Sequence, residues 1–501
     1  MKPRAIALII GCCVIGSYLS AAEAGQPDVD PLIRLVDLKL GQRASVELSN
    51  GKTVDVKLLD LKEQRDNVRN AVRKALVTVE VGGTKVTLRA ATYHLPTTVG
   101  DVQIDCSITK GYVQGKNNPW SLDADARLRL WPAGSSWIRP GTFAYPVPQR
   151  WFASGTIMAN EIGDGERPED KSIYYHWGLD IGGAESLAPV LAATDGVVIS
   201  SGDNRIDPPD YPATVHPRYD VVYLRDNRGW YYRYSHLDSI DPAVKVGARL
   251  KMGQRIGAIG KRGASGGWTH LHFDIAAMQP SGRYGILEGY AFLWQAYRDK
   301  HDPKLQAVAR PHLVGWTGEP VTLEAGRSWS AKGPGHIVDY QWILSDGTTA
   351  KGPTVERRYK RRGTYRETLK ITDADGRVDY DFAKVYIADR ADPKLLGPRL
   401  HAAYWPTFGI KAGDTVTFKV RSFAIEPDDG HETWDFGDGS PMVKVQSDGN
   451  ADAHAKDGYA VTTHVYQRPG HYLVSVQRTN RRGETGMARL HVRVGKIAGA
   501  K

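Results

Sequence analysis

The sequence predicts a mostly β, multidomain protein. Its 501 residues are too many for one ordinary hydrophobic core and indicate roughly three to four domains. Many short segments alternate polar and apolar residues with a period of two, which is the pattern of a strand with one buried face. Asn-Gly and Gly-Gly pairs lie between several of these segments and are typical of hairpin turns. We therefore expect antiparallel sheets in consecutive domains.

Residues 1–24 have the parts of a secretory signal peptide. A basic start at Lys2 and Arg4 precedes an apolar stretch, and Ala22-Glu-Ala24 provides a small-x-small cleavage signal. The apolar stretch is too short for a spanning helix, and no later stretch approaches the roughly 20 apolar residues that one requires. We expect a secreted, periplasmic or cell-wall-associated protein without a transmembrane segment. A lipoprotein signal ending at Cys12 or Cys13 is the alternative, although the apolar run before these residues is very short.

Composition narrows the classes of site and partner. Removal of residues 1–24 leaves only Cys106, so an intrachain disulfide and a multi-thiolate zinc site are excluded. The formal net charge of +10 favours attraction to an anionic cell-wall polymer. Scattered Lys and Arg residues that only keep the protein soluble would give the same net charge. The chain has no long basic run or nucleic-acid motif, so we expect no nucleic-acid partner, and the oligomeric state stays open.

Residues 25–142 are expected to form an N-terminal β domain of unknown role. Ala44–Leu48 and Thr53–Lys57 flank Asn50-Gly51, and Leu76–Glu80 and Lys85–Arg89 flank Gly82-Gly83, which predicts two hairpins in a small sandwich. Three roles fit such a domain, namely wall binding, spacing, or a pro-region that blocks a groove.

Histidines and one aspartate in three short pieces predict a metal centre. The segment Thr269–Ile275 alternates polar and apolar residues as a half-buried strand, so His270 and His272 share one face. His176 and Asp180 share a face in a helix or a strand, and the surrounding glycines favour a strand or loop. His236 lies just after a predicted hairpin of Val221–Arg225 and Trp230–Tyr234.

This residue set suits zinc and hydrolysis. Imidazole and carboxylate are normal zinc ligands, and a catalytic site keeps three protein ligands and one open position for water. Three ligands would leave two spare imidazoles for proton transfer and for stabilising a developing oxyanion. No Ser-His-Asp arrangement or reactive cysteine competes with this interpretation in the sequence.

The order of these motifs closely resembles the lysostaphin-like zinc metallopeptidases, also known as the Gly-Gly endopeptidase or LytM-type family of peptidoglycan hydrolases. The resemblance covers roughly residues 143–282, and its blocks are Tyr175–Gly183, Ala188–Val198, Tyr234–Asp238, Gly253–Gly260 and Thr269–Phe273. It implies an antiparallel β peptidase domain at 143–308 and one Zn²⁺ per chain. It further implies that His176, Asp180 and His272 hold the zinc and that His236 and His270 are catalytic.

Aromatic residues beside the histidines are expected to bind substrate in a groove. These residues are Tyr175, Trp177, Tyr234 and Trp268. Residues 200–220 form an insertion relative to the expected short connection, and either a groove wall or a simple surface loop fits it. The apolar, aromatic segment Ile286–Lys300 predicts a short helix after the last motif.

Two C-terminal stretches, 309–392 and 393–497, resemble each other and the immunoglobulin-like PKD β-sandwich. The second carries Glu432–Ser440 and His464–Val474, and the first carries a looser copy at Tyr340–Thr348. An acidic Gly turn after a strand is the shared feature, and Trp342 and Trp434 are expected in the two cores. Neither Asp435–Gly439 nor Asp373–Gly376 has the carboxylate spacing of a calcium loop. The stretches would either tether the peptidase to polymer or act as rigid spacers.

The sequence thus predicts a secreted zinc metalloendopeptidase that hydrolyses peptide bonds, with peptidoglycan cross-links or bridges, or another peptide polymer, as substrate. Two alternatives stay open. One is a secreted protease of Gly-rich proteins. The other is a noncatalytic cell-wall-binding scaffold or activator.

Overall fold

The computed structural model describes residues 29–90, 92–113, 118–163, 165–170, 172–206, 215–395 and 397–495. The predicted signal peptide and residues 207–214 of the insertion lie outside the described residues. The prediction of a mostly β, multidomain chain is confirmed. Most regular elements of the described ranges are strands, and α1 (Tyr290–His301) is the main helix there. None of the helices in these ranges is long and apolar enough to cross a membrane.

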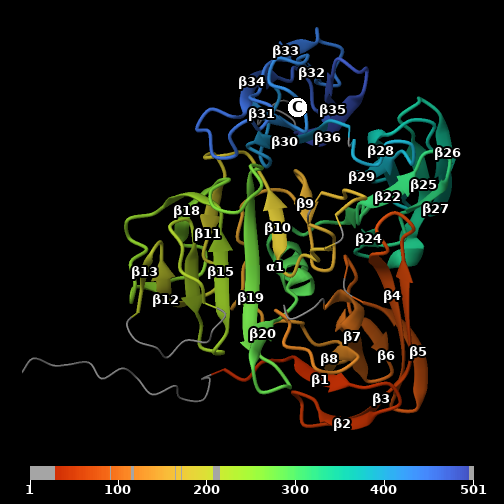
Figure 1. Cartoon of the computed structure of the whole chain (residues 1–501). Coiled ribbons are helices and arrows are strands. Elements are labelled where there is room, and N and C mark those ends of the chain that lie inside the picture. Colours follow the sequence, from red (N-terminus) through yellow and green to blue (C-terminus); the bar gives the residue numbers. More distant parts are fainter. Residues whose placement is uncertain are drawn as a thin grey trace, which may run out of the picture.

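Two four-stranded sheets form the N-terminal part, drawn in red and orange in Figure 1. They pack on one shared hydrophobic core, and both predicted hairpins are confirmed by the pairing of β2 with β3 and of β4 with β5. The first sheet has the order β1 (Arg34–Leu38), β8 (Ala126–Pro132), β7 (Val102–Thr109), β6 (Thr97–Val99), with the 3-10 turn η1 (Lys110–Tyr112) after β7. The second has the order β2 (Arg43–Glu47), β3 (Thr53–Arg65), β4 (Val72–Val81), β5 (Thr84–Arg89).

A nine-stranded sheet forms the middle of the molecule, and a three-stranded sheet accompanies it. The predicted hairpin is confirmed by the pairing of β14 with β15. The large sheet contains β13 (Asn204–Arg205), β12 (Gly196–Ser201), β14 (Val222–Arg225), β15 (Tyr231–Ser235), β19 (His270–Met278), β10 (Leu179–Gly182) and β9 (Thr156–Ile157) in this order, with β17 (Arg249–Leu250) on β12 and β20 (Tyr284–Ile286) on β19. The small sheet has the order β11 (Pro189–Leu191), β18 (Arg255–Ile259), β16 (Leu237–Ile240).

The register of strand β19 is fixed by its apolar face. Leu271, Phe273 and Ile275 are fully buried in the largest core cluster, which also contains most of α1. Burying each such side chain contributes about 1.5–3 kcal/mol. A shift of one residue would turn this face outward and place two histidines in the apolar core, so the pairing has one favourable register.

Two β-sandwiches complete the chain, and the predicted burial of Trp342 and Trp434 is confirmed, each with no exposed surface. Strands β28 and β36 meet in parallel at Thr364 and Gly486, so one sheet runs through both sandwiches. That sheet contains β22 (Leu313–Trp316), β29 (Val378–Ala388), β28 (Gly363–Asp373), β36 (Thr485–Val494), β35 (Gly470–Thr479), β32 (Glu432–Asp435) and β33 (Val443–Val445), with β25 (Ile337–Ile343) and β26 (Thr349–Lys351) beside β28. The other strands are β21 (Leu305–Gln306), β24 (Trp329–Ser330), β23 (Pro320–Glu324), β27 (Thr354–Arg358), β30 (Arg399–Trp405), β31 (Thr415–Phe423) and β34 (Ala460–Val465), with the 3-10 turn η2 (Pro334–His336).

A buried ion-pair network connects three parts of the chain. His312, just before β22, contacts Glu161 through Nδ1 at 2.7 Å and Glu166 through Nε2 at 2.6 Å. Arg73 of β4 also pairs with Glu166. Burial opposes protonation of the imidazole, but the two carboxylates prevail and raise the pKa of His312 to about 9. Protonated His312 therefore stabilises the packing of the first sandwich on the rest of the molecule.

We expect the stability contribution of His312 to disappear at high pH. Its folded-state pKa of about 9 lies above the ordinary histidine value, so the contribution is complete below about pH 6.5 and is lost as the pH rises through about 9. Denaturant titrations from pH 6 to pH 10 should show that His312→Gln lowers the free energy of unfolding most at pH 6. This deficit should shrink by on the order of 2–3 kcal/mol by pH 10. A deficit that is the same at every pH would contradict the assignment.

Candidate active site

Strand pairing brings the sequence-predicted metal ligands together. Asp180 of β10 lies directly opposite His272 of β19, and Ser235, the last residue of β15, lies opposite His272 on its other side. Because residues at i and i+2 share one face of a strand, His270 lies beside His272. The centre is therefore built on β19, an interior strand of the large sheet, where the backbone is held on both edges.

His176, Asp180 and His272 form one compact donor set. Asp180 Oδ1 lies 3.1 Å from His176 Nε2 and 2.9 Å from His272 Nδ1, and these two nitrogens are 3.0 Å apart. Donors of a tetrahedral zinc ion, with bonds of about 2.0–2.1 Å, lie roughly 3.3 Å from one another. Two imidazole nitrogens and one carboxylate oxygen at this spacing fit a zinc ion.

The surroundings prepare these groups for a cation. His272 Nε2 lies 3.0 Å from Asp274 Oδ2, which fixes the ring and directs Nδ1 to the centre. Burial raises the pKa of the Asp180 carboxyl, but His176 and His270, with hydrogen bonds from His176 and His272, hold it well below its usual value. Asp180 is thus ionised and ready to bind a cation.

His236 occupies a left-handed backbone conformation directly after β15. Its φ is 66°, a region that costs free energy for a residue other than glycine, and such strain is often found at functional sites. The Asp220 carboxylate accepts a hydrogen bond from the His236 amide at 3.0 Å and holds the turn. His236 Nδ1 lies 2.6 Å from the Arg262 carbonyl oxygen, so Nδ1 carries the proton and Nε2 is left as the acceptor.

His270 is held in the same way. Its Nδ1 lies 3.0 Å from the Trp268 carbonyl oxygen, and its ring stacks on the Trp268 ring with centroids 3.9 Å apart. His270 Nε2 lies 3.5 Å from Asp180 Oδ1, and the centroids of the His236 and His270 rings are 4.6 Å apart. Burial lowers the pKa of both imidazoles, so both are neutral bases.

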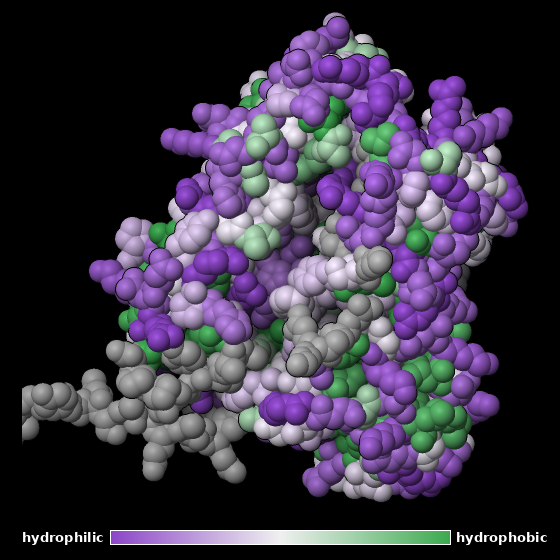
Figure 2. All heavy atoms as spheres, in the orientation of Figure 1, coloured by the Kyte–Doolittle hydropathy of each residue, from purple (hydrophilic) through white to green (hydrophobic). Residues whose placement is uncertain are grey.

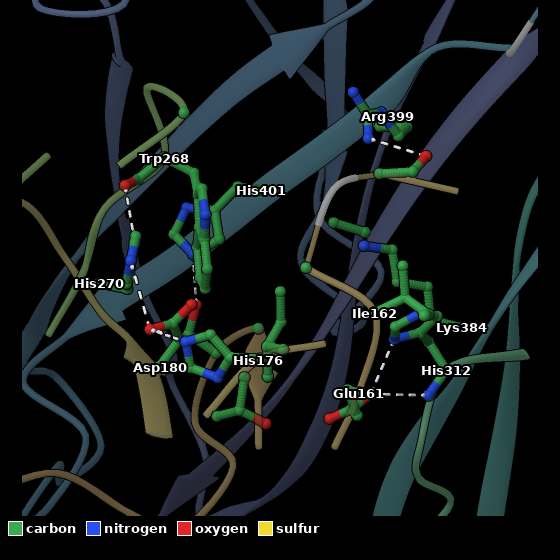
Figure 3. Close-up of a pocket in the computed structure, with 18 of the residues that line it drawn as sticks. Glu161, Ile162, His176, Asp180, Trp268, His270, His312, Lys384, Arg399 and His401 are labelled. Atoms are coloured by element: carbon green, nitrogen blue, oxygen red, sulfur yellow. Dashed lines mark hydrogen bonds and ion pairs between the residues drawn. The ribbon is translucent and has the colours of Figure 1, made fainter. Parts of the chain in front are cut away.

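These groups line a cavity of about 510 Å³ that reaches the C-terminal sandwiches. Figure 2 shows a hollow on this face with mainly hydrophilic residues in and around it. Figure 3 shows His176, Asp180 and His270 on one side of the cavity and His312, Lys384 and Arg399 on the other. His401 of β30 lies near the histidine side, with its ring centroid 5.2 Å from that of Trp268.

The sequence-based expectation for the aromatic residues needs correction. Trp268 lines the cavity. Trp177 is half-buried beside the N-terminal core, is not among the cavity-lining residues and contacts His272 only edge-on, with centroids 6.4 Å apart. Tyr175 and Tyr234 are buried in hydrophobic cores, where their hydroxyls accept hydrogen bonds from the amides of Val72 and Ala193. Neither ring is among the cavity-lining residues, so the structure gives no support to the predicted role of these two residues.

Several residues of the site were not found by sequence reasoning. Asp274 continues the alternation of His270 and His272, so the pattern did contain a signal for it. Asp220, held in turn by Arg218 at 2.7 Å, is the last residue of the insertion and belongs to no motif. His401 belongs to the second sandwich, about 130 residues from the nearest peptidase motif by sequence, and only folding brings it to the cavity.

Comparison with known proteins identifies three regions. Residues 174–282 match peptidase family M23, and residues 302–387 and 401–494 each match a PKD domain. Among solved structures, a mutant catalytic domain of the prophage-encoded M23 protein EnpA from Enterococcus faecalis is 21% identical, with a TM-score of 0.19 over 28% of this chain and 92% of that chain. Helicobacter pylori Csd3 is 14% identical, with a TM-score of 0.21 over 52% of this chain and 82% of that chain.

Proposed function

Because the chain contains a peptidase family M23 domain followed by two PKD domains, we propose that it is a secreted zinc metalloendopeptidase that cuts peptide bonds in peptidoglycan. One observation carries the proposal. Three donors from β10, β19 and the segment before β10 converge to within hydrogen-bonding distance, and the imidazoles of His236 and His270 lie beside them on the same side of an accessible cavity.

A bound zinc ion would supply Lewis acidity and a water of lowered pKa, with one ion per chain. His176 Nε2, Asp180 Oδ1 and His272 Nδ1 would hold it, and Asp274 would keep the His272 ring in place. Of the neutral pair His236 and His270, one accepts the proton of the attacking water at Nε2 and returns it to the leaving amine. The other, when protonated, donates a hydrogen bond to the oxygen of the attacked carbonyl.

The cavity supports a peptide polymer as substrate. It is open on one face, as Figure 2 shows, and it is bounded by segments from the peptidase domain and both sandwiches, so it can admit part of an extended chain. The predicted signal peptide supports action outside the cytoplasm, and the family supports peptidoglycan as the polymer. Residues from the sandwiches lie in the cavity wall, which favours a part in substrate binding over pure spacing.

Turbidity of purified sacculi tests the proposal most directly. The zinc-loaded full-length protein should clear a suspension of sacculi, and addition of a chelator should stop the clearing. New amino groups in the soluble products should show that a peptide bond was cut. If zinc-loaded protein leaves sacculi intact but degrades a Gly-rich protein, the secreted-protease alternative holds. If it hydrolyses neither, the alternative of a noncatalytic scaffold or activator holds.

We expect substitutions to separate metal binding from turnover. His236→Ala and His270→Ala should each lower kcat by about 10²–10⁴-fold, because proton transfer is lost, and should keep one zinc per chain. Asp180→Ala should lose the zinc as well. Zinc content by elemental analysis and hydrolysis rates are the measurements. His464→Ala, in the second sandwich and away from the cavity, is the matched control and should change neither. Full activity of His270→Ala would rule out the assigned mechanism.

Gly178 should be intolerant of any side chain. A Cβ atom at this position would lie 2.7 Å from His272 Cε1 and 3.0 Å from the Phe273 carbonyl oxygen, so Gly178→Ala pushes the His272 ring away from its place. We expect zinc affinity to fall by at least about tenfold while the protein stays folded. Gly326→Ala is the control, because its Cβ would meet no atom within 4 Å. Competition with a metal indicator measures both affinities, and equal values would contradict this role.

A further inference from the structure

The wall of the cavity opposite the metal centre is strongly basic. It is formed by the outer face of the sheet that runs through both sandwiches and by β30. Arg366 of β28, Lys384 of β29 and Arg399 of β30 all line the cavity. Figure 3 shows Lys384 and Arg399 reaching into the same space as His176 and Asp180. The opposite face of the same strands carries the core of the first sandwich, with Leu369 and Val385 fully buried.

The placement of these cations is unfavourable for the fold alone. Arg366 and Lys384 lie directly opposite each other in the antiparallel pair, a position where like charges destabilise a sheet. Burial, followed by the neighbouring Arg310, lowers the pKa of Arg366 to about 10, although Tyr386 opposes the shift. Burial and Arg366 also lower the pKa of Lys384. The sheet thus holds two like charges opposite each other, and the Tyr386 ring, with its centroid 4.6 Å from Lys384 Nζ, offsets part of the cost.

No carboxylate within the described residues forms an ion pair with any of the three cations. Arg366 Nε donates to the Met487 carbonyl oxygen at 3.3 Å, and Arg399 Nη1 donates to the Gly165 carbonyl oxygen at 3.4 Å. Arg399 Nε is buried without a hydrogen-bond partner. The nearby acids are used elsewhere, since Asp381 pairs with Arg310 and the two glutamates near His312 pair with that residue.

The positive potential extends across the cavity. Burial opposes ionisation of Tyr386, yet Lys384 and Arg399 lower the pKa of its phenol to about 8. Burial, then Lys384 and Arg366, lower the pKa of His401 to about 3. His401 lies beside Trp268 on the histidine side, so an anion in the cavity would experience this potential close to the reacting centre.

We propose that Arg366, Lys384 and Arg399 form a subsite that binds a free carboxylate of the peptide whose bond is cut at the His176, Asp180 and His272 centre. This inference rests on the proposed function and adds the chemical class of the substrate. Two guanidinium groups and one ammonium can donate several charge-assisted hydrogen bonds to one carboxylate. Partial burial strengthens these bonds, and the incoming charge relieves the repulsion between Arg366 and Lys384.

Binding of native and amidated peptidoglycan fragments tests the subsite. Sacculi are freed of phosphodiester polymers with hydrofluoric acid and digested with a muramidase. Half of the soluble fragments are then converted to carboxamides with carbodiimide and ammonium. Calorimetry uses the full-length, zinc-loaded protein with His270→Ala, so that fragments are bound and not cut. We expect native fragments to bind at least tenfold more tightly than amidated ones.

Substitutions test whether the basic residues cause the preference for native fragments. Lys384→Gln combined with Arg399→Gln should reduce the tenfold preference to below twofold and leave the affinity for amidated fragments unchanged. Lys370→Gln is the matched control, because Lys370 lies on the same face of β28 as Arg366 but outside the cavity lining, and it should keep the preference. Because Lys384→Gln removes a like-charge contact, its Tm should equal or exceed that of the unchanged protein, which separates lost binding from unfolding.

The outcomes distinguish this inference from the proposed function. Equal binding of native and amidated fragments, or a preference that survives in the double variant, overturns the carboxylate subsite while clearing of sacculi still stands. A preference seen only in fragments from sacculi not treated with hydrofluoric acid overturns it too, because the bound anion is then a phosphodiester. Failure of zinc-loaded protein to cut sacculi, with the tenfold binding preference intact, overturns the proposed reaction and leaves the anion subsite in place.

Discussion

The pairing of β10 with β19 is the constraint on which the rest of the site depends. It places the buried Asp180 carboxylate opposite His272, at a point where the other face of β19 is packed into the largest core. An ionised carboxylate is costly to bury unless it is paired or bound to a cation. Three imidazoles around Asp180 offset that cost in part, and a divalent ion would offset it further. The buried apolar face of β19 thus holds a charged centre on the opposite face of the same strand.

A second set of contacts orients His236 and His270, the two imidazoles proposed to transfer protons. Main-chain carbonyl oxygens of Arg262 and Trp268 hold Nδ1 of these two histidines, and the Asp220 carboxylate holds the strained turn at His236. Carbonyl oxygens cannot lose or gain a proton at ordinary pH, so they fix one tautomer reliably. Both rings therefore present the same nitrogen to the cavity, which suits groups that exchange a proton with a bound molecule.

The C-terminal sandwiches are part of the cavity wall and not merely attached to the peptidase domain. Their shared sheet supplies a basic face, and the ion-pair network around His312 fixes that face against the peptidase segment. Tethering by separate domains would raise the local concentration of substrate without altering the site. A wall that carries Lys384 and Arg399 changes the electrostatics of the site itself.

The sequence by itself determined the local structure. Period-two alternation and turn glycines located the hairpins, and the alternation through His270 and His272 assigned them to one face, because the spacing of side chains along a strand depends only on the backbone. The same alternation continues to Asp274, although the prediction did not include that residue. Tertiary structure decided everything that depends on which strands become neighbours. Tyr175 and Tyr234 turned into core residues, and Asp220, His401 and the basic face joined the site, because contacts between distant segments are set by packing that no local pattern records.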